Sequence, residues 1–159
     1  MPDDDLERCH IAALRILAYR WNSEAELRRK LASKRFERGI VDATITRLRD
    51  EKWLDDERFA SAFVRTRARK RIGRLRIRRE LIGAGVEDEI IARAVGENVN
   101  SEDERETAIR TAQRRLPILI RRYGEQAARN KLAAYLLKQG YDAALIREVI
   151  REIQVADHQ

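Results

Sequence analysis

The sequence has few of the residues that break, stiffen or cross-link a chain. Its 159 residues include one cysteine, two prolines and seven glycines, and 6% of them are aromatic. The single Cys9 has no cysteine partner within the chain, which favours a reducing compartment. So little proline and glycine argues against long disordered linkers. Strand patterns are almost absent, since only residues 116–120 resemble one and the other long segments have helical periodicity. These features predict an all-α fold.

Long apolar runs are lacking as well. No segment approaches the roughly 20 apolar residues that a membrane span needs. The start, MPDDDLERC, is acidic and leads into no apolar signal-peptide core. We therefore expect a cytoplasmic protein that makes no contact with a membrane.

Residues suited to catalysis are also scarce. The two histidines are His10 and His158, and no GxxxxGK phosphate-binding loop occurs. Cys9 and His10 are adjacent, and adjacent side chains do not meet in the geometry of a nucleophile and its base. The pair Asp55 and Asp56 lacks the further ligands of a magnesium site. The sequence thus predicts no enzyme active site, no metal site and no cofactor.

A threefold repeat is the main feature that the sequence does contain. The segments ELRRKLASKRFERGIVDATI, RIRRELIGAGVEDEIIARAV and NKLAAYLLKQGYDAALIREVI align with apolar residues in register. The aligned sets are Leu27, Ile77 and Leu132; Leu31, Leu81 and Leu136; Phe36, Val86 and Tyr141; Ile40, Ile90 and Leu145; and Ile45, Val95 and Ile150. A carboxylate follows the third set each time, as Glu37, Glu87 or Asp142, where it faces the N-terminus of the next helix.

Each repeat therefore predicts a helix, a short turn and a second helix, preceded by a further amphipathic helix. We expect three three-helix repeats, at residues 6–54, 55–98 and 99–155, stacked into an elongated, curved helical array. Because the repeats bury their own apolar faces against one another, a monomer is expected.

Several local patterns predict where helices begin. Ser23 with Glu26 has the spacing of a capping box, and so has Ser101 with Glu104. Asp55 or Asp56 is placed to cap a helix that begins at Glu57. In that helix Phe59 belongs to the predicted buried stripe, and Gly73 interrupts the chain before the stripe of Ile77 and Leu81. Four aromatic residues could stack on nucleic-acid bases, but we expect them in core or hinge packing: Trp21, Trp53, Tyr123 and Tyr135.

Positive charge is concentrated in residues 57–82, hereafter the basic segment. This segment holds ten Arg and Lys against two Glu, a net charge of +8, while the whole chain carries +7. Such a run of charges usually forms a solvent-exposed face with internal ion pairs. Here only Glu57 and Glu80 within the segment can supply the acidic partners. We therefore expect the segment to bind a polyanion, DNA phosphates or an acidic protein surface. The candidate residues are Arg65, Arg69, Lys70, Arg71, Arg74 and Arg78.

The stretch WLDDERFASAFVRTRARKRIGRLRIRRELIGAGV resembles the centre of the RecX family of recombinase regulators. The residues that carry the resemblance are Trp53, Leu54, Asp55, Asp56, Arg58, Phe59, Ala60, Gly73, Ile77, Glu80, Leu81, Gly85 and Val86. SEAELRRKL is similar to the family's first repeat and KLAAYLLKQGYDAALI to its third. Two residues depart from the pattern: Arg35 stands where the first repeat usually turns with Gly, and Pro117 interrupts the first helix of the third repeat.

The resemblance implies three tandem three-helix repeats and a bacterial cytoplasmic protein without catalysis. It implies a regulator of recombination, DNA repair and the SOS response, which binds RecA filaments on single-stranded DNA and suppresses their ATPase and strand exchange. Duplex DNA would be an accessory ligand. The alternative is a non-catalytic basic DNA-binding module or a helix-turn-helix regulator. That alternative needs base-reading residues at a helix start, whereas the third helices here begin ERGI, EDEI and DAAL.

Overall fold

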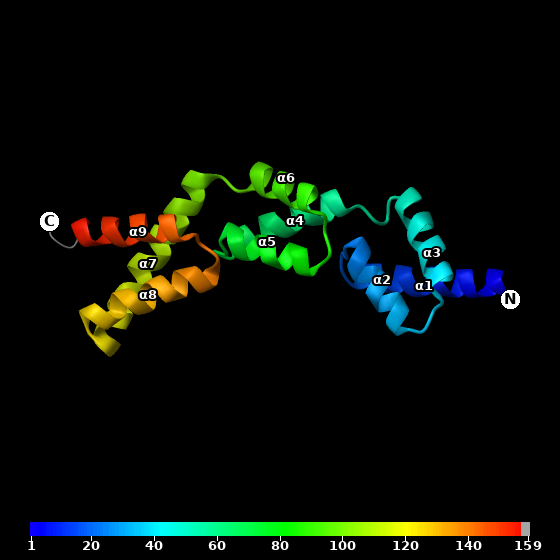
Figure 1. The fold of residues 1–159 in the computed structure, drawn as a ribbon, viewed down its shortest axis with the longest axis horizontal. Helices are drawn as coiled ribbons and strands as arrows, with labels where there is room; N and C mark the ends of the chain where they lie inside the picture. Colours follow the sequence, from blue (N-terminus) through cyan, green and yellow to red (C-terminus); the bar gives the residue numbers. More distant parts are fainter. Residues whose placement is uncertain (157–159) are drawn as a thin grey trace. The chain divides into compact units, whose positions relative to one another are not determined.

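The computed structural model describes residues 1–156 and is helical through nearly all of them (Figure 1). The helices of the described part are α1 (Pro2–Tyr19), α2 (Glu24–Ser33), α3 (Arg38–Asp50), α4 (Asp56–Arg69), α5 (Arg74–Gly83), α6 (Asp88–Asn98), α7 (Ser101–Tyr123), α8 (Glu125–Gln139) and α9 (Ala143–Ala156). No strand occurs within residues 1–156, and the predicted all-α fold of three-helix repeats is confirmed. His158 lies outside the described residues.

The apolar positions of the repeat form the core. The second helix of each trio carries two of them, and all six of these side chains are at most 1% exposed. They are Leu27 and Leu31 on α2, Ile77 and Leu81 on α5, and Leu132 and Leu136 on α8. Their spacing of four residues puts each pair on one face of its helix, so burial of that face explains why the same pattern occurs three times.

The chain divides into two compact units. Unit 1 comprises residues 1–62 and 81–94, and unit 2 comprises residues 63–80 and 95–159. In unit 1, α1, α2 and α3 pack against one another around Cys9, Ala13, Leu27 and Ile45. In unit 2, α7, α8 and α9 do so around Ala112, Leu132, Leu136 and Val149. The division passes through α4, α5 and α6. The sequence limits given above for the three repeats stay a prediction.

One of the two predicted capping boxes is present. The Ser23 hydroxyl accepts from the Glu26 backbone N–H at 3.1 Å, and the Glu26 carboxylate accepts from the Ser23 N–H at 3.5 Å. The prediction for Ser101 was wrong, because Asn100 caps α7 by accepting from the N–H groups of Glu102 and Asp103. Ser101 lies inside the helix, where its hydroxyl accepts a hydrogen bond from Arg74 at 3.2 Å.

Pro117 does not interrupt its helix, contrary to the expectation from the sequence. α7 runs continuously from Ser101 to Tyr123 with Pro117 inside it, and residues 116–120 are helical. A proline in a helix removes one backbone donor and crowds the preceding turn. Burial of Ala112 and Leu116 on the preceding turn keeps α7 packed through this point. Among the described residues, no helix is both long and apolar enough to cross a membrane.

Candidate functional site

The two acidic residues before the basic segment have different roles. The Asp55 carboxylate caps α4, because it accepts from the backbone N–H groups of Glu57 and Arg58 at 3.1 and 3.2 Å. The Asp56 carboxylate instead accepts from the backbone N–H of Glu24, the first residue of α2, at 2.9 Å. Burial raises the pKa of Asp56, and the carboxylates of Glu24, Asp55 and Glu87 add to that rise. Asp55 thus starts α4, while Asp56 ties that start to α2.

Of the four aromatic residues expected in core or hinge packing, Tyr135 is partly buried against the core of α7, α8 and α9, whereas Trp21, Trp53 and Tyr123 do not lie in a core. Trp21 and Trp53 are each 53% exposed, and Tyr123 is 41% exposed. Leu54, which follows Trp53, occupies the core position of that turn instead and is 3% exposed. The Arg58 guanidinium lies 5.2 Å from the centre of the Trp21 ring, within reach of a cation–π interaction. Phe59 is buried as predicted.

Gly73 allows the turn between α4 and α5 to lie against the turn between α8 and α9. Its N–H donates to the Gln139 carbonyl at 2.8 Å, and the Leu75 N–H donates to the Gly140 carbonyl at 3.0 Å. A Cβ at Gly73 would lie 2.4 Å from the Gly140 carbonyl carbon, so only glycine fits. The Tyr141 hydroxyl donates to the Arg71 carbonyl at 3.0 Å. Burial raises the pKa of Tyr141 to about 12, which keeps that donor protonated.

Two arginines of the basic segment are paired with Glu80. Arg67 donates to both of its carboxylate oxygens, through Nε at 2.6 Å and Nη2 at 2.5 Å. Arg76 donates through Nε to Glu80 Oε1 at 3.0 Å and through Nη1 to Gln139 Oε1 at 3.1 Å. The hydrogen bonds from Arg67, followed by those from Arg76, hold the pKa of Glu80 below its usual value. These two arginines hold α4, α5 and the end of α8 together.

Arg74, one of the predicted binding residues, also has internal partners. Its Nε lies 3.2 Å from Glu104 Oε2, and Glu104 has a side chain that is only 7% exposed. The sequence could not indicate this pair, because the two residues are 30 positions apart and Glu104 reads as part of a capping box. Removing Arg74 would leave a buried carboxylate without its counter-ion. Arg74 therefore helps to hold the site together through its ion pair with Glu104, and its guanidinium is not free as the sequence suggested.

Five cations of the basic segment are exposed and have no internal partner. Within the described residues, their side chains make no hydrogen bond and no ion pair. They are Arg69, Lys70, Arg71, Arg78 and Arg79, hereafter the unpaired cations. Arg65 is exposed as well, and its Nη1 lies 3.3 Å from Asn98 Oδ1. Of the six predicted residues, four are thus unpaired, Arg65 has a weak amide contact and Arg74 is ion-paired.

The unpaired cations come from the end of α4, the following turn and the outer side of α5. Arg69 is the last residue of α4, and the negative end of a helix dipole favours cations there. Arg78 and Arg79 follow the buried Ile77 on α5. The arrangement can bind anionic oxygens at several points at once, because arginine donates two parallel hydrogen bonds to a phosphate or a carboxylate.

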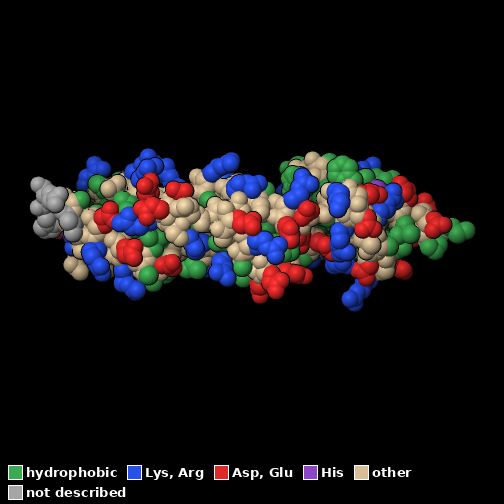
Figure 2. All heavy atoms as spheres, turned by 90° about the horizontal axis from the view of Figure 1, so that it is seen from above, with side chains coloured by type: hydrophobic (Ala, Val, Ile, Leu, Met, Phe, Trp, Pro, Cys, Tyr) green, Lys and Arg blue, Asp and Glu red, His purple; other side chains and the backbone are tan. Residues whose placement is uncertain are grey.

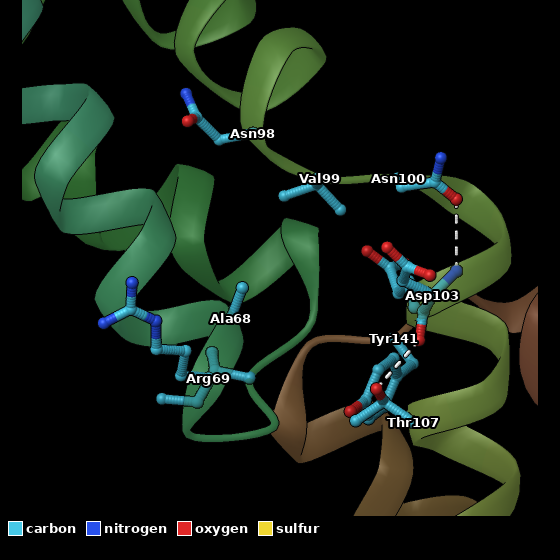
Figure 3. A pocket seen from close by; sticks show the side chains of 10 residues that line it. Ala68, Arg69, Asn98, Val99, Asn100, Asp103, Thr107 and Tyr141 are labelled. Carbon is cyan, nitrogen blue, oxygen red and sulfur yellow. Dashed lines mark hydrogen bonds between the residues drawn. The ribbon is translucent and has the colours of Figure 1, made fainter.

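A small cavity of about 210 Å³ lies beside this surface, within unit 2 (Figure 3). Its lining includes Arg69 and Ile72 from the α4 side, Asp103 and Thr107 from α7, and Tyr141 from the turn between α8 and α9. The Arg69 guanidinium points away from Asp103 and Tyr141 (Figure 3), so it is presented outward rather than into the cavity.

Over the face drawn in Figure 2, carboxylates lie between many of the Lys and Arg side chains. Residues 1–156 contain no group of three or more His, Cys, Asp or Glu side chains that could hold a metal ion.

Comparison with known proteins identifies the family of this chain. Residues 9–48, 55–95 and 102–150 match the first, second and third three-helix domains of RecX. The chain belongs to the RecX family. The regulatory protein RecX of Clostridium perfringens is 32% identical over 152 residues, which cover 95% of this chain and 71% of that protein. The regulatory protein RecX of Xanthomonas axonopodis is 36% identical over 146 residues, which cover 87% of this chain and 83% of that protein.

Solved structures agree with the sequence comparison. The crystal structure of RecX from Lactobacillus salivarius superimposes with a TM-score of 0.82 at 25% sequence identity, and covers 96% of this chain and 99% of that one. The family resemblance stated from residues 53–86 is confirmed, and with it a regulatory role of the RecX kind.

Proposed function

We propose that this protein binds RecA-type recombinase filaments on single-stranded DNA and inhibits their ATPase and strand-exchange activities. The observation that carries the proposal is the group of five unpaired cations on helices that are joined through Gly73, Glu80 and Glu104, in a chain of the RecX family. A nucleoprotein filament offers both DNA phosphates and protein carboxylates. The protein acts in the cytoplasm as a monomer, by binding rather than by catalysis.

The proposed mechanism uses steric restraint. Filament recombinases hydrolyse ATP between adjacent protomers, and strand exchange needs those protomers to move together. A protein that contacts several anionic groups across the filament holds it in one arrangement. The internal ion pairs of Arg67, Arg74 and Arg76 join the helices that carry the unpaired cations, so the backbone beneath these cations need not rearrange on binding.

The test is DNA-stimulated ATP hydrolysis by a RecA-type recombinase on single-stranded DNA, titrated with the full chain. We expect inhibition well below one molecule per recombinase, and we expect it to persist when free DNA is added. Inhibition that needs an excess of protein and disappears when free DNA is added would show that the protein only sequesters DNA.

The binding surface is tested with matched variants. In the first variant, Arg69, Lys70, Arg71 and Arg78 are changed to Gln, and Arg74 is kept because its loss would unpair Glu104. The control removes four exposed cations that also lack internal partners but lie elsewhere: Lys34, Arg38, Arg147 and Arg151. We expect the first variant to lose inhibition at least tenfold and the control to keep it. Equal losses would mean that net charge, not this surface, matters.

A sequence-specific helix-turn-helix regulator is the alternative that the sequence left open. The exposed start of α6 consists of Asp88 and Glu89, which a DNA groove would repel. The first turns of α6 and α9, the third helices of their trios, contain no Arg, Asn or Gln for base reading, which supports the filament proposal instead.

A further inference from the structure

A second group of cations lies on α7 and α8, outside the basic segment. Residues 110–138 contain eight Arg and Lys against the single acid Glu125, a net charge of +7. Residues 99–109 carry four carboxylates, which hide part of this excess when charge is summed over the whole repeat. Four of the eight cations form, with two tyrosines, what we call the α7–α8 face: Arg115, Arg122, Lys131 and Lys138, with Tyr123 and Tyr135.

Helical spacing puts these residues on one side. Arg115 and Arg122 are seven residues apart on α7, and Lys131, Tyr135 and Lys138 follow at spacings of four and three on α8. Contacts between the helices join the two stripes. The Arg115 guanidinium lies 3.7 Å from the centre of the Tyr135 ring, and Lys131 Nζ lies 4.3 Å from the centre of the Tyr123 ring. Arg122 lies 5.3 Å from the same Tyr123 ring.

The positive charge of this face is not neutralised internally. All four cations are exposed, and within the described residues none of them lies within 4 Å of a carboxylate oxygen. Glu106, the last acid of α7, is paired with Arg110 at 3.4 Å. Tyr123 is 41% exposed and Ile118 is 57% exposed, so apolar surface accompanies the charge. Clustered cations beside exposed aromatic rings are the recurring surface of proteins that bind nucleic-acid strands.

The α7–α8 face is connected to the basic segment within unit 2. Gln139 donates through Nε2 to the Tyr135 hydroxyl at 2.7 Å, and it accepts from Arg76 Nη1 at 3.1 Å. A chain of contacts therefore runs from Arg115 through Tyr135 and Gln139 to Arg76 on α5.

We propose that the α7–α8 face is a binding site for single-stranded nucleic acid. The four cations contact the phosphates, and the exposed Tyr123 offers ring surface on which an unpaired base stacks when Arg122 and Lys131 turn to the backbone. Tyr135, which is partly buried against the core, positions Arg115. A duplex keeps its bases stacked on one another and cannot use Tyr123 in this way. The site goes beyond the proposed function because it requires no recombinase.

The test measures binding of the full chain to a fluorescein-labelled oligothymidine by fluorescence anisotropy at several salt concentrations. The double variant Arg122→Gln, Lys131→Gln removes two cations from the face. The control Arg147→Gln, Arg151→Gln removes two exposed cations from α9. We expect the first to weaken binding at least tenfold and to make the slope of log affinity against log salt shallower by about 1.4. The control should stay within about twofold of the unaltered chain. Equal weakening by both would overturn the site.

The stacking role of Tyr123 is tested without a change in charge. Tyr123→Leu should weaken oligothymidine binding at least about fivefold and leave the binding of a hairpin duplex of similar length nearly unchanged. Equal losses on both ligands, or no loss on oligothymidine, would overturn the assignment to single strands. Thermal unfolding confirms that each variant is folded. Since no recombinase is present, a negative result here leaves the proposed inhibition of filaments standing.

Discussion

At the scale of single residues, three turns show how the repeat tolerates a costly substitution. Arg35, Gly85 and Gly140 stand at equivalent positions after the second helix of each trio, with φ of 68°, 76° and 101°. Glycine adopts this left-handed conformation freely, whereas arginine has a Cβ that crowds the backbone. The first repeat therefore keeps the same turn at an energetic cost, and Arg35 does not change the local geometry of the fold.

Arg35→Gly should therefore stabilise the protein. The relief of left-handed strain exceeds the entropy that glycine adds to the unfolded chain, so we expect the free energy of unfolding to rise by about 0.5–1 kcal/mol. Urea unfolding followed by circular dichroism measures the difference. Lys34→Gly is the control, because Lys34 has φ −82° and its replacement should only destabilise. Stabilisation by both variants, or by neither, would contradict this explanation.

Glu80 should make stability depend on pH in the acid range. Its pKa is lowered in the folded state by Arg67 and then Arg76, so its contribution is complete above the unfolded pKa of about 4.3–4.5. That contribution disappears as the pH falls through the folded pKa. We expect Glu80→Gln to cost about 1–2 kcal/mol at pH 7 and the difference from the unaltered chain to shrink steadily below pH of about 4.5.

The measurement is urea unfolding of both proteins across this pH range. Glu57→Gln is a suitable control, because Glu57 forms an exposed pair with Arg93, in which both side chains are more than half exposed. A pair of that kind contributes little. A Glu80→Gln effect that stays constant down to acid pH would show that packing, and not the carboxylate charge, stabilises this point.

At the scale of elements, the turn between α4 and α5 depends on close backbone contact. Gly73→Ala would bring its Cβ within 2.6 Å of the backbone of Gly140 and Tyr141, and backbone cannot move aside as a side chain can. We expect a loss of about 2–4 kcal/mol in the free energy of unfolding and weaker inhibition of the recombinase, because the surface with Lys70 and Arg71 is displaced.

Gly83→Ala is the matched control for this prediction. Gly83 lies at the end of α5, and an added Cβ would meet nothing within 4 Å. Alanine in a helix is favoured over glycine by roughly 0.5–1 kcal/mol, so Gly83→Ala should be neutral or stabilising. Gly73→Ala with unchanged stability would mean that the two turns do not need to touch.

At the scale of the whole molecule, a net charge of +7 conceals two strongly basic segments balanced by acidic ones. Binding to nucleic acid should therefore depend steeply on salt even though the net charge is moderate. If about six phosphates are contacted, affinity should fall roughly a thousandfold between 50 and 200 mM salt. Anisotropy titrations measure this slope. A flat salt dependence would show that charge does not govern binding.

Much of the fold could be predicted from the sequence, because burial of one helix face makes apolar residues recur with the helical period along the chain. Leu27, Ile77 and Leu132 are predicted core residues and are all buried. Asp55 and Ser23 were predicted helix caps and are caps. These interactions are local, within four residues, and local geometry is the same wherever the helix lies.

The candidate site could be predicted only in part. The concentration of cations in residues 57–82 is visible in the sequence, but it does not show which of them are paired. Arg74 meets Glu104 and Arg76 meets Gln139 only because the turn at Gly73 packs against the turn at Gly140. The exposure of Trp53 was likewise decided by Leu54 taking the core position.

The sequence by itself determined the helical repeat, the family and the location of the first basic segment. Each depends on residue type and on spacing along one helix, which the sequence contains in full. The tertiary structure alone decided which cations are free, since that depends on carboxylates 13 to 30 residues away. It also decided that Arg115 and Tyr135 lie together on the α7–α8 face. The two residues are on different helices, and the sequence does not show which faces of two helices pack against each other.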